Sequence, residues 1–124
     1  MIYAHSANAN GDWHPLQEHL ASVAKLAGQF SNNLTWQDEV RLAGLLHDLG
    51  KYADRFQARL KGQDSGLDHW SQGAWVALTE HRAIAAALAI QGHHVGLQRA
   101  NKDALGRMNL QGLTQNHPFR LALR

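Results

Sequence analysis

Cysteine is absent from the 124 residues of this sequence. Its absence excludes disulfide bonds, zinc sites built from thiolates and catalysis by a cysteine nucleophile, and it fits a reducing compartment. Aromatic residues are also few, at 7% of the total. No stretch alternates between polar and apolar residues with a period of two, so no strand is predicted. The sequence therefore predicts an all-α fold.

Long apolar runs are lacking as well. The longest one covers residues 83–90, far short of the roughly 20 residues that a membrane-spanning helix needs. Residues 1–14 contain no cationic segment followed by an apolar stretch, so we expect no signal peptide. We therefore expect one soluble, cytoplasmic domain over residues 1–124, with no membrane contact.

Charged residues are unevenly distributed. Residues 1–96 hold seven basic and nine acidic groups, a balance of −2, whereas residues 97–124 hold five basic groups and one acidic group, a balance of +4. A basic segment can contact nucleic-acid phosphates, but solvated surface cations explain the same pattern. If the first explanation holds, Arg99 and Lys102 are the expected DNA contacts.

Apolar residues that recur at steps of three and four predict five helices. The second starts near Thr35, with Asp38 completing a capping box. The fifth is apolar on nearly all sides and is predicted to be buried. Gly92 is expected to end it, so that His93 and His94 follow its exit. The predicted helices cover residues 15–30, 35–50, 52–60, a segment starting at 68 or 71, and 82–91.

Several ionisable residues share the inward faces or the ends of these helices. Burying such groups without partners costs several kcal/mol each, and a divalent metal removes that penalty. Imidazole and carboxylate without sulfur suit Mn²⁺, Fe²⁺, Co²⁺, Ni²⁺ or Mg²⁺, while zinc is possible but less favoured. The candidate metal ligands are His19, His47, Asp48, His69, His93 and His94.

The His47-Asp48 pair indicates what such a metal could do. Adjacent residues on a helix point about 100° apart, so the pair can flank one metal, or the carboxylate can bridge two. Two metals about 4 Å apart suit phosphodiester hydrolysis, because one lowers the pKa of a bound water and both stabilise charge on the phosphate. Lys51 could hold the scissile phosphate or stabilise the transition state. Taken singly, each residue has a structural explanation, a hydrogen-bonded core histidine or a lysine near a helix end. The ordered set indicates a metal site.

The motif at residues 47–51, HDLGK, is the signature of the HD phosphohydrolase superfamily. The DHxSxGA and GHHxGL segments are not general to HD proteins, and they narrow the resemblance. The chain resembles the HD nuclease domain of the type I CRISPR-associated helicase-nuclease. The resemblance follows the family's order through AHS at 4–6, HPLQEHLASVAKLA at 14–27, AGLLHDLGKY at 43–52, FQ at 56–57, DHWSQGA at 68–74 and GHHVGL at 92–97.

This resemblance implies a helical bundle around a buried site for two divalent metals. It makes His19, His47 and Asp48 ligands of the first metal, and it gives Asp48 and Lys51 catalytic roles. Asp48 would bridge to a second metal, whose other ligands would be His69, His93 and His94. The remaining histidines are expected to be structural or exposed, namely His5, His14, His81 and His117.

The activity that the resemblance implies is metal-dependent cleavage of single-stranded DNA, as a nick followed by exonuclease degradation. Its substrate would be the strand displaced by an RNA-guided CRISPR surveillance complex, with a helicase fused to the nuclease or separate from it. The family's last first-metal ligand is an aspartate on a later helix, which this sequence does not reach before Arg124. We therefore expect a domain truncated before that helix.

Two other functions share the same ligands. An HD phosphohydrolase acting on nucleotides or cyclic nucleotides would need no change in the set, and only the two narrower motifs favour the nuclease. A catalytically silent module could bind a partner through its helical surface and keep metal for stability alone.

Overall fold

The computed structural model describes residues 1–65 and 68–96. Within them the chain forms only helices and loops, apart from one isolated bridge between Tyr3 and Pro15, and the predicted all-α fold is confirmed. None of the described helices is long and apolar enough to cross a membrane. The sequence-based expectations beyond Gly96, including Arg99, Lys102 and His117, lie outside the described residues. The elements are α1 (Leu16–Phe30), α2 (Gln37–Leu46), the 3₁₀ helix η1 (Leu49–Tyr52), α3 (Asp54–Leu60), α4 (Ser71–Thr79) and α5 (Ile84–Val95).

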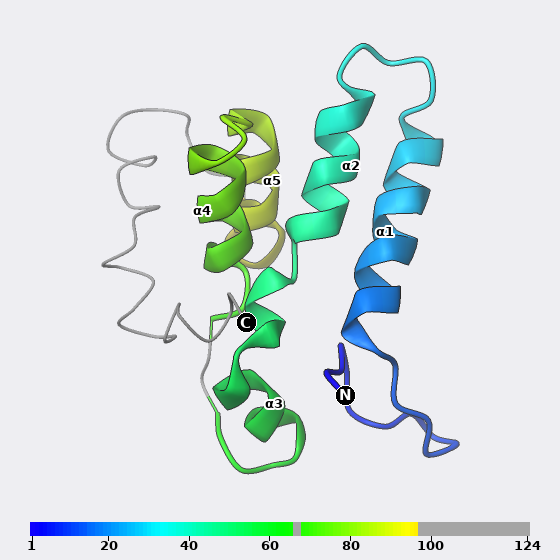
Figure 1. The fold of residues 1–124 in the computed structure, drawn as a ribbon, viewed down its shortest axis with the longest axis vertical. Coiled ribbons are helices and arrows are strands. Elements are labelled where there is room, and N and C mark those ends of the chain that lie inside the picture. The colour runs from blue at the N-terminus through cyan, green and yellow to red at the C-terminus, as the bar shows by residue number, and fades with distance from the viewer. Residues whose placement is uncertain (66–67, 97–124) are drawn as a thin grey trace.

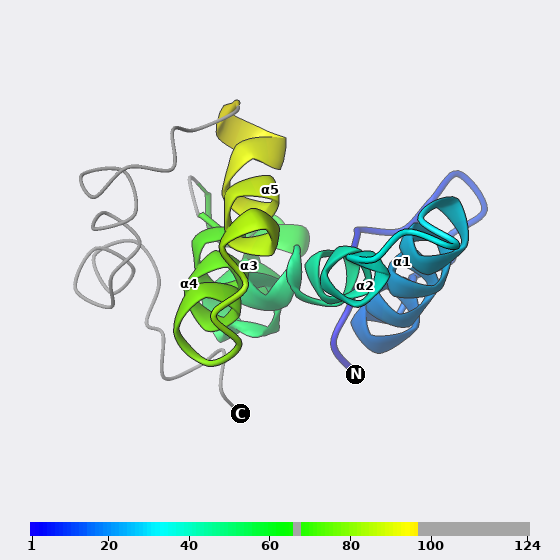
Figure 2. The ribbon, with the colours of Figure 1, turned by 90° about the horizontal axis from the view of Figure 1, so that it is seen from above.

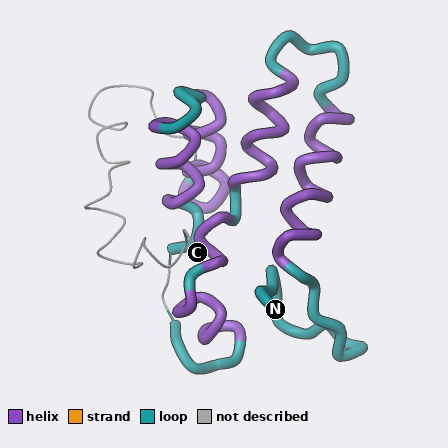
Figure 3. The backbone as a smooth tube through the Cα atoms, in the orientation of Figure 1, coloured by secondary structure: helices purple, strands orange, loops and turns teal. Residues whose placement is uncertain are grey.

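The four longer helices pack as two antiparallel pairs. Figure 1 shows α1 beside α2, and α4 beside α5, with α3 and η1 beneath α2 and α4. The view from above places α2 between α1 and the α4–α5 pair (Figure 2). The tube in Figure 3 shows that short loops join the helices of each pair. As a result, the start of α1, the end of α2, the start of α4 and the end of α5 lie at one end of the bundle.

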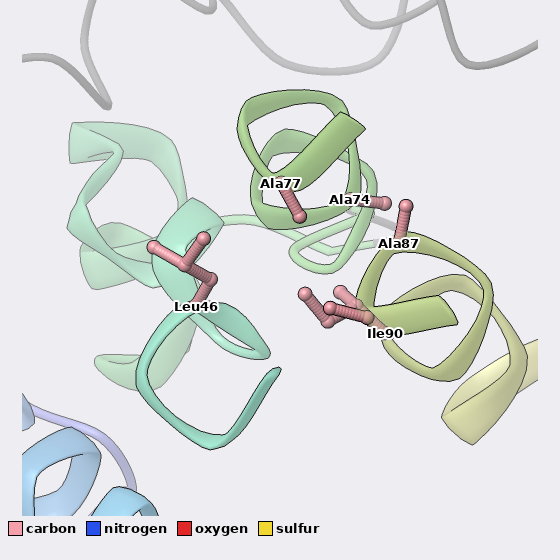
Figure 4. Packing of buried hydrophobic residues seen from close by; sticks show 6 residues of the cluster. Leu46, Ala74, Ala77, Ala87 and Ile90 are labelled. Atoms are coloured by element: carbon pink, nitrogen blue, oxygen red, sulfur yellow. The ribbon is translucent and has the colours of Figure 1, made fainter. Parts of the chain in front are cut away.

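Small residues let the helices approach closely. The central cluster consists mainly of alanines, drawn from α4 and α5, that face the end of α2 (Figure 4). Gly73 in α4 is required there, because a Cβ atom on it would lie 1.9 Å from the carbonyl oxygen of Leu46. α4 therefore rests directly on the last residue of α2. The buried members of the cluster are Leu46, Ala74, Ala77, Ala86, Ala87 and Ile90.

The second helix differs from its prediction at both ends. It begins at Gln37 with Trp36 as the N-terminal flanking residue and no side-chain cap, so the predicted capping box is wrong. It ends at Leu46, before Gly50, and the HDLGK motif is not on one helix. The tertiary contact explains the early end, because Gly50 donates its N–H to the carbonyl of His69 over 3.1 Å. A Cβ atom on Gly50 would lie 2.6 Å from that oxygen.

The fifth helix also differs from its prediction. It continues through Gly92 to Val95, so His93 and His94 lie in its last turn and not beyond its end. The helix ends at Val95, and the next residue, Gly96, has a φ of 91°, a backbone conformation that favours glycine. Burial is limited to one face, since Ile84 is 47% exposed. The smaller differences are that Pro15 precedes α1 instead of opening it, and that α3 begins at residue 54, after η1.

Candidate metal centre

The six candidate ligands come from four separate parts of the fold and meet at one end of the bundle. His19 lies on the first turn of α1, and His47 and Asp48 directly follow α2. His69 precedes α4, and the adjacent histidines 93 and 94 close α5. Two sets of three residues could each hold a metal ion, because the ligand atoms within each set all lie within 4.8 Å of one another. Asp48 belongs to both sets. We call His19, His47 and Asp48 the first group, and Asp48, His69 and His94 the second group.

The first group has the spacing of ligands around one ion. The Nε2 atoms of His19 and His47 are 3.3 Å apart, and each lies 3.2 Å from Oδ2 of Asp48. Ligands bonded about 2.1 Å from one ion lie about 3.0 Å apart in octahedral and about 3.4 Å apart in tetrahedral geometry. The nearly equilateral triangle in the first group falls between these values, so a divalent ion fits it.

A backbone carbonyl fixes the His47 ring. Nδ1 lies 2.7 Å from the carbonyl oxygen of Gly44, and because a carbonyl only accepts, Nδ1 carries the hydrogen and donates it. In the neutral ring, Nε2 then turns a lone pair toward the carboxylate of Asp48. Two such electron-rich atoms, 3.2 Å apart, require a cation between them, either a proton or a metal ion.

The direction of the His47 pKa shift agrees with a proton in that role. Burial alone would lower the pKa, but the hydrogen bond with Asp48 and the negative charge of that carboxylate outweigh burial, and the pKa of His47 is raised. A proton shared between imidazole and carboxylate therefore occupies a position that a divalent ion could take. Gly44 lies among the last four residues of α2, whose carbonyls have no partner within the helix, which is why its oxygen is available.

The second group lies on the other oxygen of Asp48 and is looser. Nε2 of His69 is 3.4 Å from Oδ1, and Nε2 of His93 is 3.9 Å from it. Nδ1 of His93 donates to the carbonyl of Ile90, which directs its other nitrogen toward Asp48. His94 completes the second group, although it is exposed.

Asp48 and Lys51 form the buried centre of the site. They are 4% and 6% exposed, and Nζ of Lys51 lies 2.9 Å from Oδ2 of Asp48. The same ammonium donates to the carbonyl of Ala4 over 3.0 Å. Burial would raise the pKa of Asp48, but the hydrogen bonds and positive charges of His47 and Lys51 bring it far below its ordinary range. Asp48 is therefore a carboxylate, the form that binds a metal.

The imidazoles around Asp48 are mostly held neutral. Burial lowers the pKa of His69 to about 3, and burial also lowers the pKa values of His19 and His94. Within the described part of the chain, Nδ1 of His69 is buried without a hydrogen-bond partner. The nitrogen of His69 that faces Asp48 is Nε2, and a neutral imidazole with little tendency to take a proton suits a metal ligand. The ionised carboxylate and the neutral imidazoles of His19, His69 and His94 thus fit a divalent metal, and His47 would release its proton when the metal binds.

Neighbouring residues that the sequence did not reveal hold the second group in place. The carboxylate of Asp68 accepts hydrogen bonds from the backbone of Trp70 and Ser71, each over 2.9 Å, and fixes the turn that carries His69. The Trp70 ring stacks on His94, with centroids 4.5 Å apart and planes 24° apart. The DHWS sequence fits this turn, but the stacking depends on where α5 ends. Three histidines that were not expected to be ligands, His5, His14 and His81, are exposed.

A helical bundle that gathers histidines from several elements around one buried carboxylate is typical of metal-dependent hydrolases. Comparison with known families agrees with this class, because the HD domain family matches residues 16–120. The match covers most of the chain, which therefore belongs to the HD domain family, and the predicted superfamily is confirmed. A comparison with curated proteins gave no match.

Proposed function

We propose that this domain is a metal-dependent nuclease that cleaves single-stranded DNA. The observation that carries the proposal is the position of Asp48, whose two carboxylate oxygens each face a different set of histidines. A carboxylate in that position can bridge two ions, the arrangement that suits phosphodiester hydrolysis. The two ions would be divalent, from among manganese, iron, cobalt, nickel and magnesium.

Each side chain has a definite role in this proposal. His19, His47 and Asp48 would hold the first ion, and the second would be held by Asp48 with His69, His93 and His94. When bound, the ions supply positive charge that makes a water molecule a better nucleophile and stabilises the phosphate oxygens. Lys51 places an ammonium 2.9 Å from Asp48, where it could contact an oxygen of the scissile phosphate.

Single-stranded DNA as the substrate rests on the ordered motifs of the sequence. DHWSQGA at 68–74 and GHHVGL at 92–97 resemble the CRISPR-associated nuclease more than HD proteins in general. The proposed setting is therefore CRISPR interference in the cytoplasm, with a nick followed by exonuclease degradation. The partners would be an RNA-guided surveillance complex and a fused or separate helicase.

A second candidate is hydrolysis of nucleotides or cyclic nucleotides. It is favoured by the family match, which stands at the level of the HD domain and covers residues 16–120. The same ligands would serve both reactions. Circular single-stranded DNA separates them, because a nuclease linearises and degrades it while a nucleotide hydrolase leaves it intact.

Metal stoichiometry and cleavage of circular single-stranded DNA, measured on the same preparations, test the proposal. The wild-type protein should bind two Mn²⁺ or Ni²⁺ ions and cleave the circle. Asp48→Ala should abolish cleavage and reduce metal binding at both groups while the far-ultraviolet circular dichroism stays helical. Asp54→Ala, which removes an exposed carboxylate six residues away, is the control.

Cleavage that survives Asp48→Ala would refute the proposed centre. Because removal of Asp48 leaves Lys51 buried without its carboxylate, His94→Ala is the second variant. His94 is exposed, so its loss should affect metal binding and cleavage without unfolding the domain. A His94→Ala protein with full activity would contradict the role of the second group.

A further inference from the structure

A pocket of about 390 Å³ opens beside the candidate metal centre. Its walls come from the N-terminal segment, η1, α3 and His69 in the segment that leads into α4. Lys51 and His69 belong both to the pocket wall and to the surroundings of Asp48, so the pocket adjoins the place where a scissile phosphate would lie. The lining residues are Ala4, His5, Ser6, Lys51, Phe56, Arg59, Leu60 and His69.

The pocket has the chemistry of an anion site. Lys51 and Arg59 supply positive charge, His5 and Ser6 can supply hydrogen-bond donors, and no carboxylate is among the described lining residues. Two of the three hydrogens on the Lys51 ammonium serve Asp48 and Ala4, which leaves one for a ligand.

Both cations of the pocket lie near the ring of Phe56. Phe56 is 4% exposed, and its ring centroid lies 5.5 Å from Nζ of Lys51 and 5.6 Å from Cζ of Arg59. Cations held against an aromatic ring at this range gain stability from its negative face. The guanidinium is therefore held near a rigid part of α3, and such a group binds phosphate through paired N–H donors.

We propose that this pocket binds the phosphate next to the scissile one in a nucleic-acid strand, with Arg59 as its main contact and His5 and Ser6 as further donors. The inference rests on the proposed nuclease function. It explains how the nuclease site would prefer a nucleic-acid strand to a single nucleotide. Sites that follow a single strand combine a positive groove with the regular spacing of backbone phosphates. This pocket places positive charge and hydrogen-bond donors beside the reacting phosphate, where the next phosphate of a strand would lie.

Three small substrates test the inference. The dinucleoside monophosphate TpT has one phosphodiester and no neighbouring phosphate, whereas pTpT and TpTp carry a second phosphate at the 5′ or the 3′ end. The wild-type protein with Mn²⁺ should show a higher kcat/KM on at least one of the two extended substrates. Arg59→Gln should reduce that preference about tenfold, the effect of losing one charged hydrogen bond.

Arg55→Gln is the matched control. It makes the same change in charge on the same helix, but Arg55 is paired with Asp64 at 2.9 Å and is not among the pocket residues. It should leave the preference for the second phosphate intact. Equal preferences in Arg59→Gln and the wild type would overturn the inference, as would an equal loss in both arginine variants.

A binding measurement separates this inference from the nuclease proposal. If the wild type cleaves neither these three substrates nor circular single-stranded DNA, the proposed reaction fails. The affinity for fluorescein-labelled decathymidylate, measured by anisotropy with a chelator present, then tests whether the pocket binds a phosphate of the strand. Weaker binding by Arg59→Gln than by Arg55→Gln supports it, and equal dissociation constants overturn it.

Discussion

The two sides of Asp48 differ in how firmly they are built. On the Oδ2 side, His19 and His47 lie 3.2 Å from the oxygen and 3.3 Å from each other, and both rings are partly buried. On the Oδ1 side, the distances lengthen to 3.4 Å for His69 and 3.9 Å for His93, and the two histidines at the end of α5 are exposed. The first group is therefore compact, and the second is spread across three segments.

This difference follows from the elements that support each group. The first group depends on one antiparallel helix pair, α1 and α2, whose close approach at Gly44 brings His19 beside His47. The second group needs α4 and α5 to dock correctly on the end of α2, and then needs the ring of Trp70 to hold His94. A site assembled from more independent contacts is easier to disrupt, and the predictions that follow test that difference.

Gly73→Ala should disrupt the Oδ1 side of Asp48 more than any other change. Its Cβ atom would lie 1.9 Å from the carbonyl of Leu46, so α4 would have to move away from α2. We expect a loss of about 3 kcal/mol in the free energy of unfolding, the upper range for overpacking, measured by urea denaturation. Metal binding at the second group should fall as well, because the same movement carries His69 away from Asp48.

Gly44→Ala is the matching glycine substitution on the Oδ2 side of Asp48, and its stability is to be compared with that of Gly73→Ala. There the added Cβ would lie 3.0 Å from the Cα atom of Ala24, a contact that a small shift relieves, and alanine favours a helix by about 1 kcal/mol over glycine. A stability within about 1 kcal/mol of the wild type is expected. Equal losses from both substitutions would contradict the contrast between the two sides.

Single ligand replacements should distinguish the groups by affinity. His19→Ala is expected to weaken the tighter of two Mn²⁺ sites on the order of a hundredfold, and His94→Ala to weaken the looser one about tenfold, in proportion to their burial and spacing. Isothermal titration calorimetry at constant pH measures both. The contrast fails if His94→Ala removes the tighter site.

In the metal-free protein, His69 and His47 should contribute to the pH dependence of stability with opposite signs. His69 has a pKa of about 3 when folded against an ordinary value of 6.5, so the unfolded chain binds more protons between these values. Its contribution to stability is complete above pH 6.5 and is lost as the pH falls, with a slope of at most about 1.4 kcal/mol per pH unit. The raised pKa of His47 acts in reverse, stabilising below 6.5 and losing its effect as the pH rises through the folded value.

His69→Gln should therefore flatten the pH dependence of urea denaturation between pH 3 and 6.5, with a chelator present throughout. The exposed His81 supplies the control, because His81→Gln should leave the slope unchanged. A slope that persists in His69→Gln would show that another group controls acid stability.

Trp70→Ala should produce a smaller effect than His19→Ala. The stacked ring contributes about 0.5 to 1.5 kcal/mol beyond its burial, so the looser Mn²⁺ site should weaken about three- to tenfold. A double-mutant cycle with His94→Ala checks the cause, because the effect of Trp70→Ala should disappear once His94 is gone. Additive losses would mean that Trp70 acts through the core instead.

The helices were predicted more accurately than their ends. The apolar steps of α1 place Leu16, Leu20 and the partly buried His19 on one face, and the structure has the same helix within one residue. The end of α2 was misplaced because Gly50 resembles a stop signal, while the backbone of His69 ends the helix four residues earlier. The local pattern contains no information about that distant carbonyl.

The metal site, like the helices, has features that the sequence predicts and features that it does not. Imidazoles and one carboxylate without sulfur could be recognised as a potential metal set from residue types and order alone. The contributions of Trp70 and Arg59 could not, because each depends on an element packed from elsewhere in the chain. The role of Gly92 was also misjudged, since α5 continues past it against the cluster around Ile90.

By itself, the sequence determined the all-helical class, the HD family and the chemical nature of the donors, since these depend on periodicity, motif and side-chain type. The tertiary structure decided that both oxygens of one buried carboxylate are shared, that one side is compact and the other loose, and that a cationic pocket adjoins them. Those properties arise from backbone approaches such as Gly73 against Leu46, which only the packed helices create.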